Sequence, residues 1–471
     1  MESYTQAQSP FDRADGDVVL LSSDQVKFSC HKITLSIASP FFSDMFSLKQ
    51  RDDQKDDVIT GDGTPVVPVT EDSTVLYNLL LLLYPLPQPK TLLSLNMAAS
   101  LLEAGRKYDI AVVKERAKTN LMSNIQERPL KVFAIACGLD MDEEARAAAH
   151  HLLTMTIESR HQELRHVSVL ENVSAGAYCR LLQYLRAEGK VPPDFCFTHH
   201  DVPATAKTAA STQVETLLVD YPSHKLSLWS NTDFFHRNPQ DVLVRSEDSY
   251  MFPAHCLVLS LASTHFAEIL ESRTIPSQDG SPPIIDLPEK AVVVYDILRC
   301  CYGLPPSDDD DADDLFSLIR VAATYQMAHA LELLRNLMRP LISSTPLRTY
   351  FVSAALGWDD EAQRAALCAA KSGSVYVYVP EMETALTPVY YRLVQFRRKI
   401  FARSFEVATN DMMVRPRYLS TRIHKILAQQ PAESSGGNIS NWTKYYAART
   451  ELDNIMDGTL DSQLCQVRVS S

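Results

Sequence analysis

The chain has 471 residues, of which 45% are hydrophobic and 22% are charged, as is usual for a globular protein. Its net charge of −13 argues against generic binding to nucleic acids or anionic membranes, because such binding depends on Lys and Arg that neutralise phosphates. Glycine accounts for only 14 residues, and no group of glycines has the spacing of a phosphate-binding loop.

Cysteine usage and the N-terminal sequence indicate the compartment. The 9 cysteines include no C-x-x-C motif, so we expect no disulfide framework. The first residues are polar and acidic, unlike a signal peptide, and the most apolar run, 75–86, is too short to span a membrane. These features predict a cytoplasmic or nuclear protein.

The first predicted elements are strands. Residues 1–16 are polar, and we expect them to be disordered. Residues 17–21 and 26–30 are rich in β-formers around a polar turn, which predicts a hairpin. A helical pattern follows, and it restarts at Ser39, a predicted N-cap, with Pro40 in the first helical position.

The rest of this unit is mostly helical by pattern. Residues 66–69 predict a third strand, and a helix begins near Glu71. Further helices are expected over 97–123, 129–154 and 168–187. A small sheet followed by many helices is typical of the α+β class.

The same unit occurs twice. Residues 17–46 align without a gap to 241–270, with 11 of 30 positions identical. Residues 129–149 align to 346–366, with 8 of 21 identical. Repeats of this length are whole domains and not short stacked repeats. We call the two units the first copy and the second copy.

The predicted domain bounds follow from this repeat. They are a disordered N-terminus (1–16), a first domain (17–123) with its helical extension (124–187), a linker (188–235), a diverged second domain (236–340) with its helical extension (341–400), and a helical C-terminal extension with a loop (401–471).

The motifs of the first copy resemble the opening of a BTB/POZ domain, closest to fungal BTB proteins. The run from Asp17 to Phe46 contains the F-x-x-H-K and S-P-F-F strings, and the run from Leu101 to Tyr108 resembles the later L-L-x-A-x-x-K-Y pattern. The second copy keeps the frame but has Thr264 where the first has Pro40. The helices after each domain lie where BACK-like helices follow such modules.

The resemblance implies structural roles for eight repeated residues: Asp17, His31, Ser39, Phe42, Asp241, His255, Ser263 and Phe266. A catalytic role for the histidines would need a nucleophile within hydrogen-bond reach, and the sequence indicates none. We therefore predict a non-enzymatic protein without a catalytic, cofactor-binding or metal site. The adjacent pair His150-His151 and the run 199–201 lack the helical spacing that metal ligands need.

The function that the resemblance implies is protein–protein interaction. We expect the copies to pair within one chain or to dimerise between chains, and docking onto cullin-3 ubiquitin ligases is a further implied role. The family's hydrophobic-x-Glu contact falls in register on 50–52 and 274–276, and neither segment fits it. The alternative is a transcriptional regulator that acts through protein partners. Candidate partner contacts are Met45, Phe46, Leu48, Ile269, Leu270 and Glu271.

Two charged segments can be explained without a functional role. The run 308–314 holds six aspartates and predicts a solvated loop, although it could recruit a basic partner. The basic stretch 415–425 is too dilute to indicate nuclear import.

Overall fold

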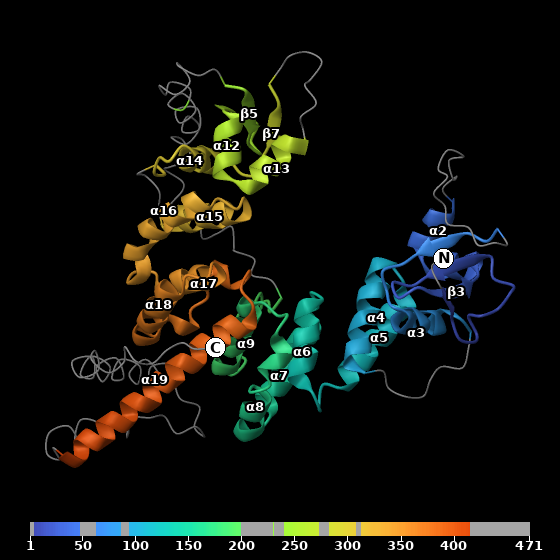
Figure 1. The fold of residues 1–471 in the computed structure, drawn as a ribbon. Coiled ribbons are helices and arrows are strands. Elements are labelled where there is room, and N and C mark those ends of the chain that lie inside the picture. The colour runs from blue at the N-terminus through green and yellow to red at the C-terminus, as the bar shows by residue number, and fades with distance from the viewer. Residues whose placement is uncertain are drawn as a thin grey trace. The chain divides into compact units, whose positions relative to one another are not determined.

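The computed structural model describes residues 4–47, 63–85, 94–198, 229, 240–272, 282–307 and 312–414, with side chains as far as residue 400. The chain divides into two compact units, residues 1–200 and residues 201–471. Each unit is a small sheet with helices, which confirms the predicted α+β class (Figure 1). Among the described residues, none of the helices has the length and apolar character needed to cross a membrane.

The first unit contains a four-stranded sheet in the order β1-β3-β2-β4. The predicted hairpin is present, with β2 (Val18–Leu21) antiparallel to β3 (Val26–Cys30), and its turn has Gln25 at φ 63°. The predicted third strand is β4 (Val66–Pro68), which runs parallel to β2. All four residues of β2 are buried, so this central strand reads as a continuous apolar run.

The prediction that residues 1–16 are disordered is wrong for the described residues from 4 onward. Strand β1 (Thr5–Gln6) pairs in parallel with β3. Phe11 is 1% exposed, and its ring meets those of Tyr77 and Tyr84 at centroid distances of 5.6 and 5.4 Å. Aromatic residues scattered through a polar segment produce no periodicity, so only the tertiary contact reveals that Phe11 is buried.

The helices of the first unit follow the predicted order, with two exceptions. They are α1 (Lys32–Ala38), α2 (Pro40–Ser47), α3 (Ser73–Leu83), α4 (Leu95–Lys107), α5 (Ala111–Ser123), α6 (Pro129–Gly138), α7 (Asp142–Thr154), α8 (Ile157–Glu163), the 3-10 turn η1 (Val167–Leu170) and α9 (Ala175–Arg186). Helix α8 was not predicted, and the helix predicted over 168–187 is a 3-10 turn followed by α9. Pro129 begins α6, where a missing N–H has no cost, and acidic residues fill the first turn of α7, where the helix dipole favours them.

The predicted linker also needs correction at its start. The backbone N–H groups of Phe197 and Thr198 donate to Asp142 Oδ1 at 2.5 and 3.3 Å. The buried ring of Phe197 packs edge-on against Phe133 and Tyr184. The Pro and Thr composition indicated a linker, but Phe197 and Phe195, whose ring also packs against Tyr184, anchor this segment to the helical extension.

The second unit repeats the arrangement with a three-stranded sheet in the order β6-β5-β7. Its strands are β5 (Val242–Arg245), β6 (Met251–Ala254) and β7 (Ile284–Asp286). Its helices are α12 (Cys256–Ala262), α13 (Thr264–Ser272), α14 (Ala291–Cys301), α15 (Ala312–Thr324), α16 (Ala328–Met338), α17 (Pro346–Ala355), α18 (Asp359–Ser372) and α19 (Thr387–Val414), with 3-10 turns η3 (Arg339–Ile342), η4 (Ser374–Tyr376) and η5 (Pro380–Met382).

Trp229 extends the core of the second unit beyond the predicted domain start at 236. It is 1% exposed, its Nε1–H donates to the Pro253 carbonyl at 2.8 Å, and its ring meets Tyr295 and Tyr302 edge-on. These tyrosines repeat Tyr77 and Tyr84, so Trp229 occupies the place that Phe11 has in the first unit. A lone tryptophan in a segment read as linker carried no periodic signal.

Two further bounds differ from the predictions. Helix α19 continues without a break across the predicted boundary at residue 400. The acidic run predicted to be a loop ends inside α15, because Asp313 and Asp314 form part of its first turn, where carboxylates are favoured. Residues 308–311 and 415–471 lie outside the described residues, and so do the basic stretch and most of the predicted C-terminal extension.

A buried glutamate joins each domain to its helical extension. In the first unit Lys118 of α5 pairs with Glu144 of α7 at 2.6 Å. In the second unit Glu361 of α18 accepts from Arg335 of α16 at 2.6 Å and from Arg339 at 2.8 Å. The glutamates repeat each other, and so do Lys118 and Arg335.

Candidate functional site

The repeated aspartates cap helices. Asp17 Oδ1 accepts from the backbone N–H of Lys32 at 2.7 Å, at the start of α1. Asp241 Oδ1 accepts from the N–H of Cys256 at 2.6 Å, at the start of α12. Each carboxylate therefore satisfies a helix N–H that has no partner within its own helix, which is a structural task.

Each repeated histidine forms hydrogen bonds with a tyrosine that is also repeated. The Tyr84 hydroxyl accepts from the backbone N–H of His31 at 2.9 Å and lies 3.2 Å from His31 Nδ1. The Tyr302 hydroxyl has the same two contacts with His255, at 3.1 and 2.6 Å. Since a hydroxyl that accepts from the N–H can donate its own proton to Nδ1, this ring nitrogen is occupied within the fold.

The repeated serines join two parts of each domain. Ser39 Oγ donates to the Tyr108 carbonyl at 2.5 Å and accepts from the Phe42 N–H at 3.2 Å, so it caps α2 as predicted. Ser263 makes the corresponding bonds to Tyr325 and Phe266 at 2.5 and 3.0 Å.

Phe42 and Phe266 complete this network. They stack on Tyr108 and Tyr325 at centroid distances of 5.0 and 5.1 Å, and both are 1% exposed. All eight repeated residues thus hold helices and the sheet together.

Four cysteine thiols have a shifted pKa, and none of the four is an activated nucleophile. Burial raises the pKa of the Cys30 and Cys301 thiols to about 12 and that of Cys256 to about 11. Burial also raises the pKa of Cys137. Because the thiolate is the reactive form, these four side chains remain protonated and unreactive at neutral pH.

The pair His150-His151, considered as a metal ligand, is not brought together with other ligands among the described residues. In the described part of the chain, no group of three or more His, Cys, Asp or Glu side chains could hold a metal ion. His150 Nδ1 lies 3.4 Å from the Tyr184 hydroxyl. His199, His200 and Asp201 lie outside the described residues.

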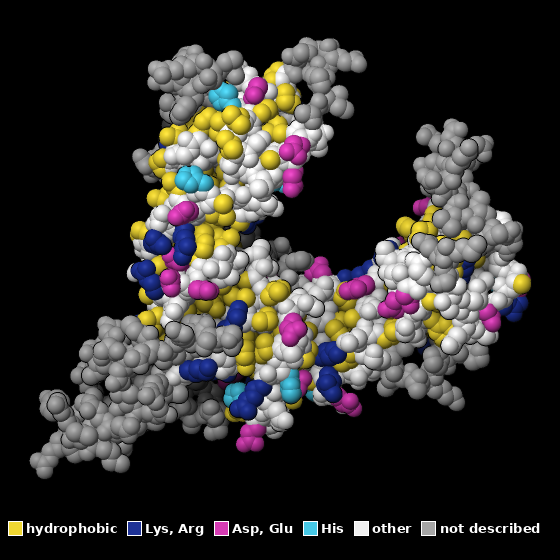
Figure 2. All heavy atoms as spheres, viewed as in Figure 1, with side chains coloured by type: hydrophobic (Ala, Val, Ile, Leu, Met, Phe, Trp, Pro, Cys, Tyr) yellow, Lys and Arg dark blue, Asp and Glu magenta, His cyan; other side chains and the backbone are white. Residues whose placement is uncertain are grey.

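An exposed apolar stripe recurs on the first helix of each domain. Ile33 and Ile37 of α1 are 66% and 80% exposed, and Leu257 and Leu261 of α12 are 69% and 79% exposed. The members of each pair are four residues apart, so they share one helix face. The four positions correspond to each other in the repeat. We call these two surfaces the α1 face and the α12 face. Hydrophobic side chains are visible on the surface of the part that carries α12 and α13 (Figure 2).

Most of the predicted partner contacts are less exposed than these faces. Met45 and Phe46 are half-buried, and Phe46 stacks on Phe42 at 6.1 Å. Ile269 and Leu270 pack partly against the core, whereas Glu271 is exposed. Leu48 lies outside the described residues, as do 50–52 and 274–276. Sequence reasoning missed the α1 and α12 faces, although their shared apolar letters at equal spacing were a usable signal.

Comparison with known families identifies the repeated module. The model of the BTB/POZ domain matches residues 11–125 and again residues 219–340. The chain belongs to the BTB/POZ domain family. Its two BTB domains are consecutive, as the internal repeat predicted, and the matches begin early enough to include Phe11 and Trp229. No curated protein matches the chain.

Family membership sets the general function. BTB domains mediate protein–protein interaction and self-associate, and tandem copies fit such a role. The module is not catalytic, which agrees with the structural roles of the repeated Asp, His and Ser residues.

Proposed function

We propose that this protein is a non-enzymatic interaction scaffold whose two BTB domains bind each other within one chain through the α1 and α12 faces. The observation that carries the proposal is the pair of exposed isoleucines on α1 repeated as a pair of exposed leucines on α12. Single exposed apolar residues are common, but the same stripe retained in both copies indicates a shared surface.

Energetics favour pairing within the chain. Burying a Leu or Ile side chain contributes about 1.5–3 kcal/mol, so four of them supply a gross gain of several kcal/mol. Ordering and desolvation consume part of that gain. Because both domains belong to one chain, the covalent connection raises the effective concentration of the partner domain, which favours even a modest interface.

The test combines mass with side-chain footprinting. Light scattering on the full chain should give a monomer, and carbene labelling should find Leu257 and Leu261 protected. Ile37→Asp should raise labelling of α12 severalfold, because a carboxylate in an apolar contact is unfavourable. Ile157→Asp is the matched control, since Ile157 of α8 is also exposed, at 42%, and lies outside both faces.

Two outcomes would overturn intramolecular pairing. One is a stable homodimer that Ile37→Asp converts to monomers, which would place the pairing between chains. The other is a monomer in which α12 is labelled equally in the wild type and in Ile37→Asp.

We also propose a more specific role, as an adaptor for a cullin-3 ubiquitin ligase, and this proposal rests on the family resemblance. Retention of the full chain by purified cullin-3 would support it. The alternative, a transcriptional regulator acting through protein partners, predicts concentration in the nucleus and no retention by cullin-3. We propose the cytoplasm, the nucleus or both as its location, to be tested by imaging the tagged chain.

A further inference from the structure

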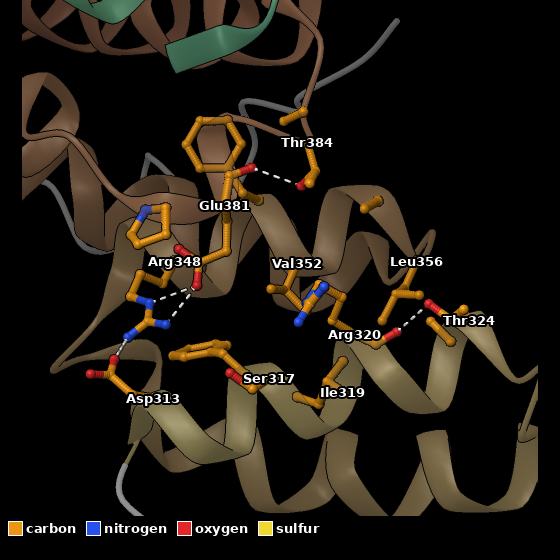
Figure 3. Close-up of a pocket in the computed structure, with 16 residues that line it drawn as sticks. Asp313, Ser317, Ile319, Arg320, Thr324, Arg348, Val352, Leu356, Glu381 and Thr384 are labelled. Atoms are coloured by element: carbon orange, nitrogen blue, oxygen red, sulfur yellow. Dashed lines mark hydrogen bonds and ion pairs between the residues drawn. The ribbon is translucent and has the colours of Figure 1, made fainter. Parts of the chain in front are cut away.

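A cleft opens in the second unit where the BTB domain meets its helical extension. Its volume is about 640 Å³, and it lies between α15, α17 and residues 380–385 (Figure 3). Apolar side chains line much of it, among them Phe316, Ile319, Val352 and Leu356. None of the eight repeated framework residues and none of the α12 face lines this cleft.

One end of the cleft has an excess of negative charge. Arg348 donates from Nε to Glu381 Oε1 at 2.7 Å and also pairs with Asp313. Because two carboxylates pair with a single guanidinium, this end of the cleft carries one uncompensated negative charge. Glu381 Oε2 is buried and has no hydrogen-bond partner among the described residues. A buried carboxylate oxygen without a donor is costly, so this atom is suited to receive a donor from a ligand.

A positive charge lies further along the same cleft. Arg320 follows Asp313 by seven residues on α15, and Figure 3 shows it between the Arg348 end and the end formed by Thr324 and Leu356. Its guanidinium makes no hydrogen bond or ion pair with any described residue. Two helical turns separate the positions of Asp313 and Arg320, which amounts to about 10 Å along the helix axis.

The first copy fills the corresponding space differently. Arg106 of α4, at the position of Ala323, donates to the Leu139 carbonyl and so bridges the ends of α4 and α6. Glu103 takes the place of Arg320. The second copy thus has a small side chain where the first has a long one, and the opposite charge one turn earlier.

We infer that this cleft binds an amphipathic helix of a partner protein. The helix would present a basic residue to the end of the cleft that holds Asp313 and Glu381, and an acidic residue to Arg320, which follows Asp313 by two turns of α15. Apolar residues would lie between these two charges. The cleft walls are mostly helices whose backbone groups are already bonded, so they cannot satisfy an extended backbone. A helix brings its own backbone hydrogen bonds and needs only side-chain contacts.

A stapled synthetic peptide provides the first test. The probe carries Lys and Glu seven residues apart with leucines three and four positions after Lys, and its binding to the full chain is measured by fluorescence anisotropy. Ala323→Arg, which restores the first-copy residue, should weaken binding at least tenfold by occupying the cleft. Ala328→Arg is the control, because Ala328 is exposed on α16 and does not line the cleft.

A double-mutant cycle then tests the charge contact. Glu381→Gln should weaken the Lys probe at least fivefold but leave a probe with Gln in place of Lys nearly unchanged, because only the first pair loses an ionic bond. In the same way, Arg320→Gln should weaken the probe that carries Glu but leave a probe with Gln in place of Glu nearly unchanged. Circular dichroism of each variant confirms that it is folded.

The inference is independent of the pairing of the BTB domains. Ile37→Asp should leave probe affinity unchanged, so the two proposals can fail separately. No binding of the Lys–Glu probe, equal affinity for Ala323→Arg and Ala328→Arg, or zero coupling between Glu381 and the probe Lys would each overturn the helix-binding cleft.

Discussion

The two BTB domains differ most at the junction with their helical extensions. In the first copy one lysine binds the buried Glu144, whereas in the second two arginines bind the corresponding Glu361. Arginine can direct several N–H donors at a carboxylate, so the second junction has the stronger ionic contact. The position of the ion pair was kept after the duplication, while the number of cations that bind the glutamate differs between the copies.

The same contrast holds between framework and surface. The caps made by Asp17 and Ser39 recur at Asp241 and Ser263 with nearly equal distances. Surface positions have changed, as at Arg106 and Ala323. The caps that begin the helices have therefore changed less between the copies than the residues beside the cleft.

The largest expected effect comes from the aromatic anchors that precede each domain. Phe11→Ala and Trp229→Ala should each cost about 3–5 kcal/mol in the local free energy of unfolding, because each empties a buried aromatic site. Hydrogen exchange of the full chain, followed by mass spectrometry of its peptides, measures each unit separately. Tyr4→Ala is the control, since Tyr4 is 36% exposed. Equal exchange in Phe11→Ala and Tyr4→Ala would mean that the N-terminal segment is not an anchor.

The next effect compares the junctions directly. Glu361→Gln should destabilise the second unit by about 3 kcal/mol, since it removes the charge that two arginines share. Glu144→Gln should cost the first unit about 1–2 kcal/mol, because one lysine is involved. The same exchange experiment measures both, and equal losses would show that the junctions have not diverged.

The pH dependence of the second unit should reflect the same residue. Hydrogen bonds from Arg335, opposed by burial and aided by Arg339, lower the pKa of Glu361 from 4.5 to about 2. Because the unfolded state takes up its proton first, this stability is complete above about pH 4.5 and is lost as the pH falls toward 2. The loss amounts to about 3 kcal/mol at most.

Urea unfolding at pH 6 and at pH 3 measures this dependence. Glu361→Gln should show a smaller difference between the two pH values than the wild type. The same slope in both proteins would assign the acid sensitivity to other carboxylates.

The smallest expected effect concerns the repeated serine caps. Ser39→Ala and Ser263→Ala should each cost about 1–2 kcal/mol, because each removes a helix cap and a donor to a buried tyrosine carbonyl. Ser43→Ala, on the same helix as the first cap but in neither contact, is the control. Exchange of the α2 and α13 amides reports the loss, and a difference of more than twofold between the copies would show that the framework has also diverged.

Much of the fold followed from local signals. The hairpin, the Ser39 cap and the helix pair over 97–123 were predicted, because alternation, capping residues and apolar spacing are local properties. Phe11, Phe197 and Trp229 were missed, since each lies in a segment without helical or strand periodicity and its burial depends on distant partners. The exposed α1 face was missed because an apolar helix pattern does not tell which residues face the core.

The sequence by itself determined the duplication, the BTB/POZ module and the Ser39 cap, because these depend on local residue patterns and on letters repeated at constant spacing. Only the tertiary structure decided which repeated apolar residues lie outside, where the arginine pair meets Glu361, and that Ala323 helps to leave a cleft beside Arg320 and Glu381. The physical reason is that exposure and cavity shape are properties of packing between segments far apart in the chain.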